Sequence, residues 1–137
     1  MDLGHWQYSD KWPDNCYGFI YEIKNNTTNR KYIGRKQVQK TIKRRPLKGK
    51  KNKRHIITES DWKTYTGSCN ELNDRINELG KDNFTFTILR ICNSKWELAY
   101  YEAELQFKLG VLLSGEYYNG IINCRIRNKP LDRSSWT

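Results

Sequence analysis

The stretch Phe19-Ile20-Tyr21, followed by Tyr32-Ile33-Gly34, decides the fold of this chain. The triplets lie in two short runs, residues 17–23 and 31–34, that are rich in residues favouring β-strands. The residues between these runs are polar and typical of a turn. We therefore predict two strands joined in a hairpin that brings two tyrosines and a glycine together.

The rest of the chain predicts one more strand and two helices. Residues 68–71, Ser-Cys-Asn-Glu, form a capping-box pattern before a helix that runs to Leu79. Residues 94–97, Ser-Lys-Trp-Glu, form a second one before a helix that runs to Leu109. Between them, residues 83–91 alternate apolar side chains with threonines, which predicts a strand with one apolar face.

This order of elements predicts an α+β fold, a small three-stranded antiparallel sheet flanked by helices. We divide the chain into an N-terminal arm (1–16), one domain (17–124) and a C-terminal tail (125–137), with a turn and a short strand at 121–122. The four cysteines are widely spaced, which favours free thiols over a zinc site or a disulfide framework.

Length and charge narrow the classes of function. A chain of 137 residues is one domain's worth, and its formal charge of +10 favours a polyanionic partner, most simply nucleic acid. The chain has no run of apolar residues long enough for a membrane span and no signal-peptide pattern at its start. We expect a cytoplasmic protein with no membrane partner.

The positive charge is concentrated directly after the Tyr-Ile-Gly triplet. Eleven Lys or Arg residues and no acidic residue lie in 35–55, and the remaining 14 basic residues face 15 acidic ones. Pro46 and Gly49 interrupt this segment, which predicts a mobile basic loop over 35–55. We expect phosphate contacts from Lys40, Lys43, Arg44, Arg45, Lys48, Lys50, Lys51, Lys53, Arg54 and His55.

Hydrolysis of a phosphodiester needs a group that activates water, a cation near the phosphate, and usually a carboxylate that holds a metal ion. The hairpin offers only Glu22, which points to the sheet face opposite Tyr21. The second helix offers three glutamates, and Glu97 already belongs to the capping box. At 100° per residue, Glu102 lies about 60° from the core stripe of that helix and Glu104 about 100°, so Glu102 is the better candidate.

Tyr21, Tyr32 and Gly34, at this spacing, resemble the signature of the GIY-YIG nuclease family. The resemblance covers roughly residues 17–124 and implies a DNA endonuclease. Glu102 matches the helix glutamate that binds the metal ion in the family, and Asn119 matches its late asparagine.

Three segments are more narrowly similar to the small phage-encoded SegE-like branch of the homing-type endonucleases. They are residues 32–36, 61–68 and 117–120. If the protein is phage-encoded, its place is the host cytoplasm. Homing-type relatives carry a separate DNA-recognition domain, for which this chain has no room. The resemblance therefore implies loose sequence preference, recognition of a DNA structure, or dependence on a partner.

The chain departs from the family pattern at two points. Phe19 stands where the family usually has glycine, and Gly18 lies one position earlier, where it relieves crowding. The family's arginine follows its glycine on a helix, but here the basic segment intervenes. Its candidates are Arg35, Lys36, Arg44 and Arg45, of which we favour Arg35 or Lys36 because the strand end holds them near both tyrosines.

The resemblance also implies a mechanism. Tyr21 or Tyr32 orients or deprotonates the attacking water. A tyrosine can act as the base only if neighbouring cations lower the pKa of its phenol. Glu102 holds one divalent ion, for which Mg²⁺ is suited. Arg35 or Lys36 stabilises the charge on the phosphate, and Asn119 bonds the glutamate or the scissile region. Tyr65 contacts phosphate or packs in the interior.

Two other classes of function compete with the nuclease. A non-catalytic nucleic-acid-binding protein could use the basic loop as an electrostatic clamp, but this leaves the tyrosines, Glu102 and Asn119 unexplained as a set. A structural RNA-associated protein fits the charge and size but lacks an aromatic RNA-binding signature. A nuclease with one site per chain needs a homodimer on DNA, or two successive nicks, to cut both strands.

Overall fold

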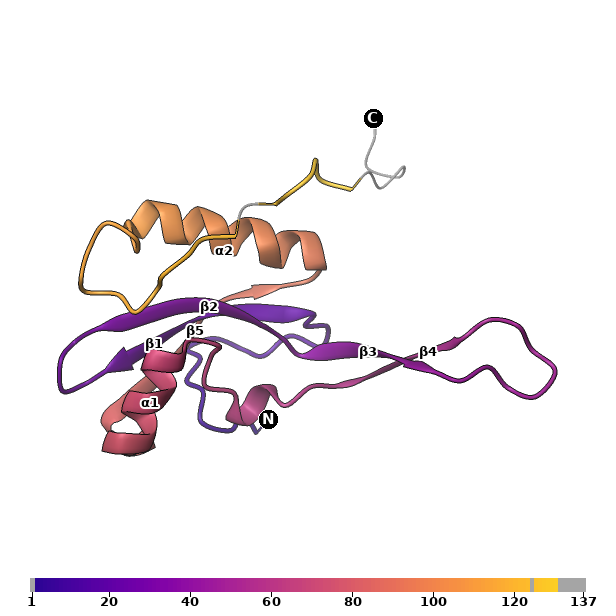
Figure 1. The fold of residues 1–137 in the computed structure, drawn as a ribbon, viewed down its shortest axis with the longest axis horizontal. Helices are drawn as coiled ribbons and strands as arrows, with labels where there is room; N and C mark the ends of the chain where they lie inside the picture. The colour runs from indigo at the N-terminus through magenta and orange to yellow at the C-terminus, as the bar shows by residue number, and fades with distance from the viewer. Residues whose placement is uncertain (1, 124, 131–137) are drawn as a thin grey trace.

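The computed structural model describes residues 2–123 and 125–130. It is an α+β fold built on a three-stranded antiparallel sheet in the order β2-β1-β5, as predicted. The strands of this sheet are β1 (Gly18–Asn25), β2 (Lys31–Gln37) and β5 (Phe84–Cys92). Helix α2 (Lys95–Leu109) lies over one face of the sheet and α1 (Asn70–Leu79) lies on the other side (Figure 1).

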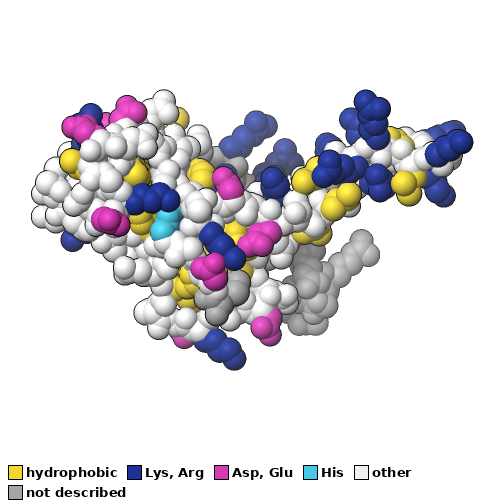
Figure 2. All heavy atoms as spheres, turned by 90° about the horizontal axis from the view of Figure 1, so that it is seen from below, with side chains coloured by type: hydrophobic (Ala, Val, Ile, Leu, Met, Phe, Trp, Pro, Cys, Tyr) yellow, Lys and Arg dark blue, Asp and Glu magenta, His cyan; other side chains and the backbone are white. Residues whose placement is uncertain are grey.

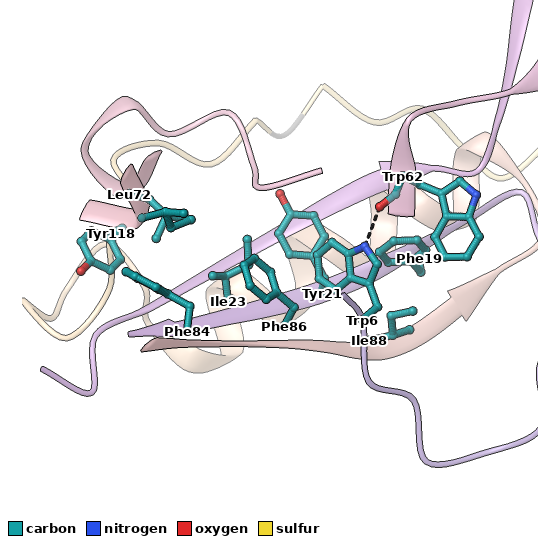
Figure 3. Packing of buried hydrophobic residues seen from close by; sticks show 11 residues of the cluster. Trp6, Phe19, Tyr21, Ile23, Trp62, Leu72, Phe84, Phe86, Ile88 and Tyr118 are labelled. Atoms are coloured by element: carbon teal, nitrogen blue, oxygen red, sulfur yellow. Dashed lines mark hydrogen bonds between the residues drawn. The ribbon is translucent and has the colours of Figure 1, made fainter. Parts of the chain in front are cut away.

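The two faces of the sheet carry separate cores, because successive side chains of a strand point to opposite faces. Phe19, Tyr21 and Ile23 of β1 pack with Trp6 and Trp62 on the α1 side (Figure 3). The opposite face packs under α2 through Ile20, Ile33, Cys92, Leu98 and Val111. Strand β2 is the free edge of the sheet, and its Gly34 pairs with Tyr21.

The prediction of a mobile loop over residues 35–55 was wrong. Strand β2 continues to Gln37, and a second, two-stranded sheet follows from β3 (Gln39–Arg44) and β4 (Arg54–Glu59). The two strands form an arm that projects from the body of the protein (Figure 1). The density of lysine and arginine hides the β-branched residues that favour these strands, namely Thr41, Ile42, Ile56, Ile57 and Thr58.

The arm is anchored at its root. Val38 donates a backbone hydrogen bond to Tyr17 (2.9 Å), and Ser60 donates one back to Val38 (2.8 Å). The Val38 side chain also packs against the core on the α1 side. The short 3-10 turn η1 (Trp62–Thr64) then leads the chain back into the body, where Trp62 is fully buried.

One capping box formed and the other did not. The Ser94 hydroxyl accepts a hydrogen bond from the backbone N–H of Glu97 (3.1 Å), as predicted. Helix α1 instead begins at Asn70 with Cys69 at its N-cap and no side-chain cap bond. The glutamate that should complete that box, Glu71, is engaged by Arg30 (2.8 Å).

After α2 the chain returns along the edge strand β2. Lys31 donates a backbone hydrogen bond to Glu116 (2.9 Å) and accepts one from Tyr118 (2.7 Å). The strand predicted at 121–122 did not form, because the backbone pairing with β2 ends at Tyr118 and Asn119 then bonds β2 through its side chain. Leu109, the last residue of α2, is 40% exposed, whereas Gln106, one turn earlier, is buried.

Two predictions from composition can be compared with the described residues. Cys16, Cys69 and Cys92 are free, and Cys124 lies outside the described part of the chain. None of the helices described is both long and apolar enough to span a membrane.

Candidate active site

A pocket of about 270 Å³ lies beside the edge strand β2. Because β2 is an edge strand with no further strand of the described sheet beside it, side chains from both faces of the sheet meet beyond it. The pocket brings together four of the residues predicted to be catalytic, Tyr21, Tyr32, Arg35 and Glu102. The remaining lining comes from Tyr65, Ser68, Gln106, Ile121 and Asn123.

Tyr21 reaches this pocket across Gly34. Its ring belongs to the core, only 1% exposed, while its hydroxyl lies at the β2 edge. A methyl group at Gly34 would stand 2.5 Å from that hydroxyl and 2.9 Å from the Tyr32 ring. Gly67, whose φ is +87°, faces the same hydroxyl from the other side. Two glycines therefore make the space in which the phenol lies.

Tyr32 lies half-buried at the other side of Gly34. Its hydroxyl is 3.4 Å from that of Ser68, within hydrogen-bonding distance. The chain before Ser68 is held by Asn73 of α1, which donates to the Gly67 carbonyl (3.1 Å) and accepts from the Thr66 hydroxyl (2.6 Å). Helix α1 thus fixes the loop that carries Ser68 beside the tyrosines.

Glu102 lies where its angle on the helix predicted. Its side chain is 13% exposed, and its Oε1 lies 3.8 Å from Arg35 Nε. Burial raises the pKa of Glu102, and the charge of Arg35 partly opposes this rise. Glu104, in contrast, is exposed and does not line the pocket.

The environment of both phenols disfavours their deprotonation. Burial raises the pKa of Tyr21 well above its usual value, and neighbouring Tyr32, Tyr65 and Glu102 raise it further. Burial also raises the pKa of Tyr32, against a smaller lowering by its bond to Ser68. The lowering of a tyrosine pKa by cations, which a base role would require, is therefore not found in the free protein, because burial dominates and raises both pKa values.

Asn119 does not bond Glu102. Its side-chain oxygen accepts from the Ile33 N–H (3.0 Å) and its amide donates to the Ile33 carbonyl (2.8 Å). Gln106 of α2 donates to the same carbonyl (2.9 Å). These buried amides satisfy the outward-facing backbone of the edge strand and so hold β2 in place beside the pocket.

Of the two favoured cations, only Arg35 lines the pocket. Lys36 lies on the other face of β2, where its Nζ contacts Asp61 (2.7 Å) and stands 4.0 Å from the Tyr65 ring centre. The hydrogen bond from Lys36 lowers the pKa of Asp61. Tyr65 lines the pocket and packs edge-on against Tyr21.

The predicted phosphate contacts lie along the arm. Lys40, Lys43 and Arg44 belong to β3, Arg54 and His55 to β4, and the other five to the turn between them, namely Arg45, Lys48, Lys50, Lys51 and Lys53. All ten are exposed. Figure 2 shows their dark blue side chains gathered on the projecting arm, away from the magenta acidic ones.

Four lining residues were not predicted from the sequence. Ser68 was assigned to a helix cap, Ile121 to a short strand, and Gln106 and Asn123 lay in no motif. Gln106 carries a signal that could have identified it, because it follows Glu102 by one helical turn and a buried polar residue there requires a partner.

Glu102 is the lining residue of this pocket that could hold a metal ion through a carboxylate. No group of three or more His, Cys, Asp or Glu that could hold a metal ion occurs in the described part of the chain. Mg²⁺ commonly uses one carboxylate with waters and phosphate oxygens. Glu102, facing a polar and open pocket, offers such a ligand.

Comparison with known proteins identifies the family. No curated protein and no solved structure matches the chain. The family described as "Putative endonuclease segE, GIY-YIG domain" matches residues 4–122, which include every residue of the pocket but Asn123. The chain therefore belongs to the SegE-like branch of the GIY-YIG endonuclease family.

Proposed function

We propose that this protein is a metal-dependent DNA endonuclease that hydrolyses phosphodiester bonds. The observation that carries the proposal is the meeting of Tyr21, Tyr32, Arg35 and Glu102 around one pocket, although they come from three separate elements. The family supports nuclease chemistry, and the exposed basic arm supports DNA as the polyanion.

In this mechanism Glu102 and Arg35 provide the electrostatic stabilisation. Glu102 would hold the metal ion, for which Mg²⁺ is best suited, and a bound ion would supply charge stabilisation at the leaving oxygen. Arg35 stands 3.8 Å from the carboxylate and, being 43% exposed, can turn to a non-bridging phosphate oxygen. Its charge also favours the ionised form of Glu102, which the metal requires.

The phenols act as hydrogen-bonding groups rather than as tyrosinates. Tyr32, the less buried of the two, orients the attacking water. The proton that this water releases passes through the Tyr32 hydroxyl toward Ser68 and from there to solvent. Tyr21, fixed by its packing against Gly34 and Gly67, donates to a phosphate oxygen. A preorganised donor of this kind is worth about 10²–10³ in rate.

Supercoiled plasmid tests the proposal. The wild type with Mg²⁺ should produce nicked or linear DNA, whereas EDTA or Glu102→Ala should abolish cleavage. Glu104→Ala is the matched control, since Glu104 lies on the same helix but is exposed, and it should cleave like the wild type. Cleavage by Glu102→Ala in the presence of Mg²⁺ would contradict the assignment of the metal ligand.

A second candidate function is a non-catalytic protein that clamps nucleic acid. The basic arm is the one feature of the described structure that favours it. It predicts tight, salt-sensitive binding and no cleavage by any variant. If the protein does cut, the dependence of linear product on protein concentration separates two routes. A homodimer on DNA gives linear product early and cooperatively, whereas single chains accumulate nicked circles first.

A further inference from the structure

We propose that the β3–β4 arm reads DNA sequence from the major groove, with the face that carries Thr41 and Ile57 turned to the bases. The proposal rests on the proposed function, from which it takes DNA as the partner. It differs from the expectation of loose sequence preference, because it assigns recognition to an element within this domain.

The arm has the dimensions of a groove-binding ribbon. It consists of six residue pairs, from Gln39–Glu59 at the root to Arg44–Arg54 at the end. Two strands lie about 4.8 Å apart and six residues rise about 20 Å. The major groove is about 12 Å wide and admits a two-stranded ribbon, which at this length follows roughly half a helical turn.

The charge of the arm is unfavourable unless a polyanion lies beside it. Arg44 stands directly opposite Arg54. Like charges in such a pair destabilise a ribbon. No acidic residue occurs between Lys36 and Glu59 to relieve them. Phosphates along both rims of a groove supply the missing negative charge.

The two faces of the ribbon differ in how open they are. One face pairs Ile42 with Ile56, and Ile56 is 38% exposed. The other pairs Thr41 with Ile57, and Ile57 is 69% exposed. Burying the side chain of an isoleucine that is this exposed to water is favourable in free energy. Aliphatic and threonine methyl groups contact thymine methyls, and a threonine hydroxyl bonds to base edges.

The open face is connected to the catalytic pocket. That pocket shares Arg35 with a neighbouring hollow of about 520 Å³, which is lined also by Lys40 and Lys95. Lys95 lines in turn a third hollow, of about 390 Å³, whose other walls include Thr41 and Ile57. A duplex whose phosphates follow these cations would pass from the cleavage site to the reading face of the arm.

Duplex RNA does not fit this surface. Its A-form major groove is too narrow for side chains to reach the bases, and its accessible groove is shallow. The arm's shape therefore selects B-form DNA over RNA, although both offer phosphates to the lysines.

Binding selection tests the inference without requiring catalysis. The full chain carrying Glu102→Ala is incubated, in EDTA, with a duplex DNA library that has a randomised segment, and the bound fraction is sequenced. The same background then carries Thr41→Ala with Ile57→Ala. The matched control is Ile56→Ala with Thr58→Ala, which removes the same residue types from the opposite face. A duplex RNA library is run in parallel.

We expect a selected motif with the parent protein, its loss with Thr41→Ala/Ile57→Ala, and its retention with the control. Affinity for the selected sequence should fall about tenfold or more, the cost of one lost base contact, while affinity for random DNA stays the same. Methylation of guanine N7 within the motif should block binding, since that atom lies in the major groove.

Three results would overturn the inference: binding without any motif, loss of the motif in the control pair, or equal selection from the RNA library. Failure to bind DNA at all would contradict the proposed function as well. Failure of the wild type to cleave, with the motif intact, would contradict only the nuclease and leave the reading role of the arm in place.

Discussion

Gly34 shows how the absence of one side chain shapes the pocket. Its position on the edge strand lets the Tyr21 hydroxyl pass from the core to the site. Any Cβ there meets the end of a ring that is fixed by the core on all other sides. The residue is therefore required by close packing, not by a left-handed backbone.

Gly34→Ala should displace the Tyr21 phenol and destabilise the protein by about 1–3 kcal/mol, as overpacking does. Cleavage should fall at least tenfold in addition, because the hydroxyl leaves the pocket. Gly120→Ala is the control, since a Cβ at Gly120 meets nothing within 4 Å. Urea unfolding measures the first effect and plasmid cleavage the second. An unchanged unfolding midpoint would show that the pocket has more room than its distances indicate.

The proposed role of Glu102 as metal ligand makes metal binding depend on pH in a defined direction. Only the ionised carboxylate binds Mg²⁺, and burial raises its pKa above the usual value. At a Mg²⁺ concentration 100 times the dissociation constant, the ion should stabilise the protein by about 2.7 kcal/mol. When the solution is acidified, this stabilisation should disappear at a higher pH than it would for an exposed glutamate. Differential scanning fluorimetry from pH 4 to about 8 follows this loss.

Two variants check the assignment. Arg35→Ala removes the charge that opposes the rise in pKa, so the loss of Mg²⁺ stabilisation should move to still higher pH. Glu102→Gln should show no Mg²⁺ effect at any pH. In EDTA the sign is opposite: the fold favours the neutral carboxyl, so the metal-free wild type should lose stability as pH rises through the pKa of Glu102. A Mg²⁺ effect that ignores Arg35→Ala would place the ion elsewhere.

At the scale of elements, the site depends on how the edge strand is held. β2 has β1 on one side only, and on the other its Ile33 backbone is bonded by Asn119 and Gln106. The segment that carries Asn119 thus acts as a short substitute for a fourth strand. Asn119 therefore holds β2 in place beside the pocket and does not itself line the pocket.

Asn119→Ala should lower the free energy of unfolding by about 2–3 kcal/mol, because it leaves the buried Ile33 N–H without a partner. Hydrogen exchange at the Ile33 amide should become faster, an effect that a purely catalytic role would not produce. Asn128→Ala, at an exposed position, should change neither quantity. Full stability with lost cleavage would instead return Asn119 to direct contact with the substrate.

Elements with a strong local pattern were predictable from the sequence. The hairpin, the third strand and α2 have alternation, turn residues or a cap that acts within a few positions, and each was confirmed. The arm was missed because electrostatic repulsion suggested disorder, whereas β-branched pairs and the root at Val38 support two strands. The resemblance to the family identified Asn119, but the sequence did not reveal its hydrogen-bonding partner, because Asn119 bonds the backbone of Ile33, which is distant in sequence.

At the scale of the whole molecule, charge is divided between two parts. The body holds the pocket and is nearly neutral overall, while the arm between Gln39 and Glu59 holds nine Lys and Arg residues. Phosphate contacts supply affinity without selecting sequence. Affinity and catalysis should therefore be separable, with substitutions in the arm changing binding and substitutions in the pocket changing turnover.

The salt dependence of binding measures this division. Lys48, Lys50 and Lys51 lie in the turn of the arm, and each one that contacts a phosphate releases counterions on binding. Replacing all three by glutamine should flatten the plot of log K against log salt by about 0.9 per contact, up to about 2.7 in total. The same net charge is removed from the body by Lys11→Gln, Lys108→Gln and Lys129→Gln, at exposed positions outside the arm. Since counterion release depends on contact and not on net charge, the body triple should keep the wild-type slope. Equal slopes for the two triples would mean that Lys48, Lys50 and Lys51 contact no phosphate, which would contradict their assignment as DNA contacts.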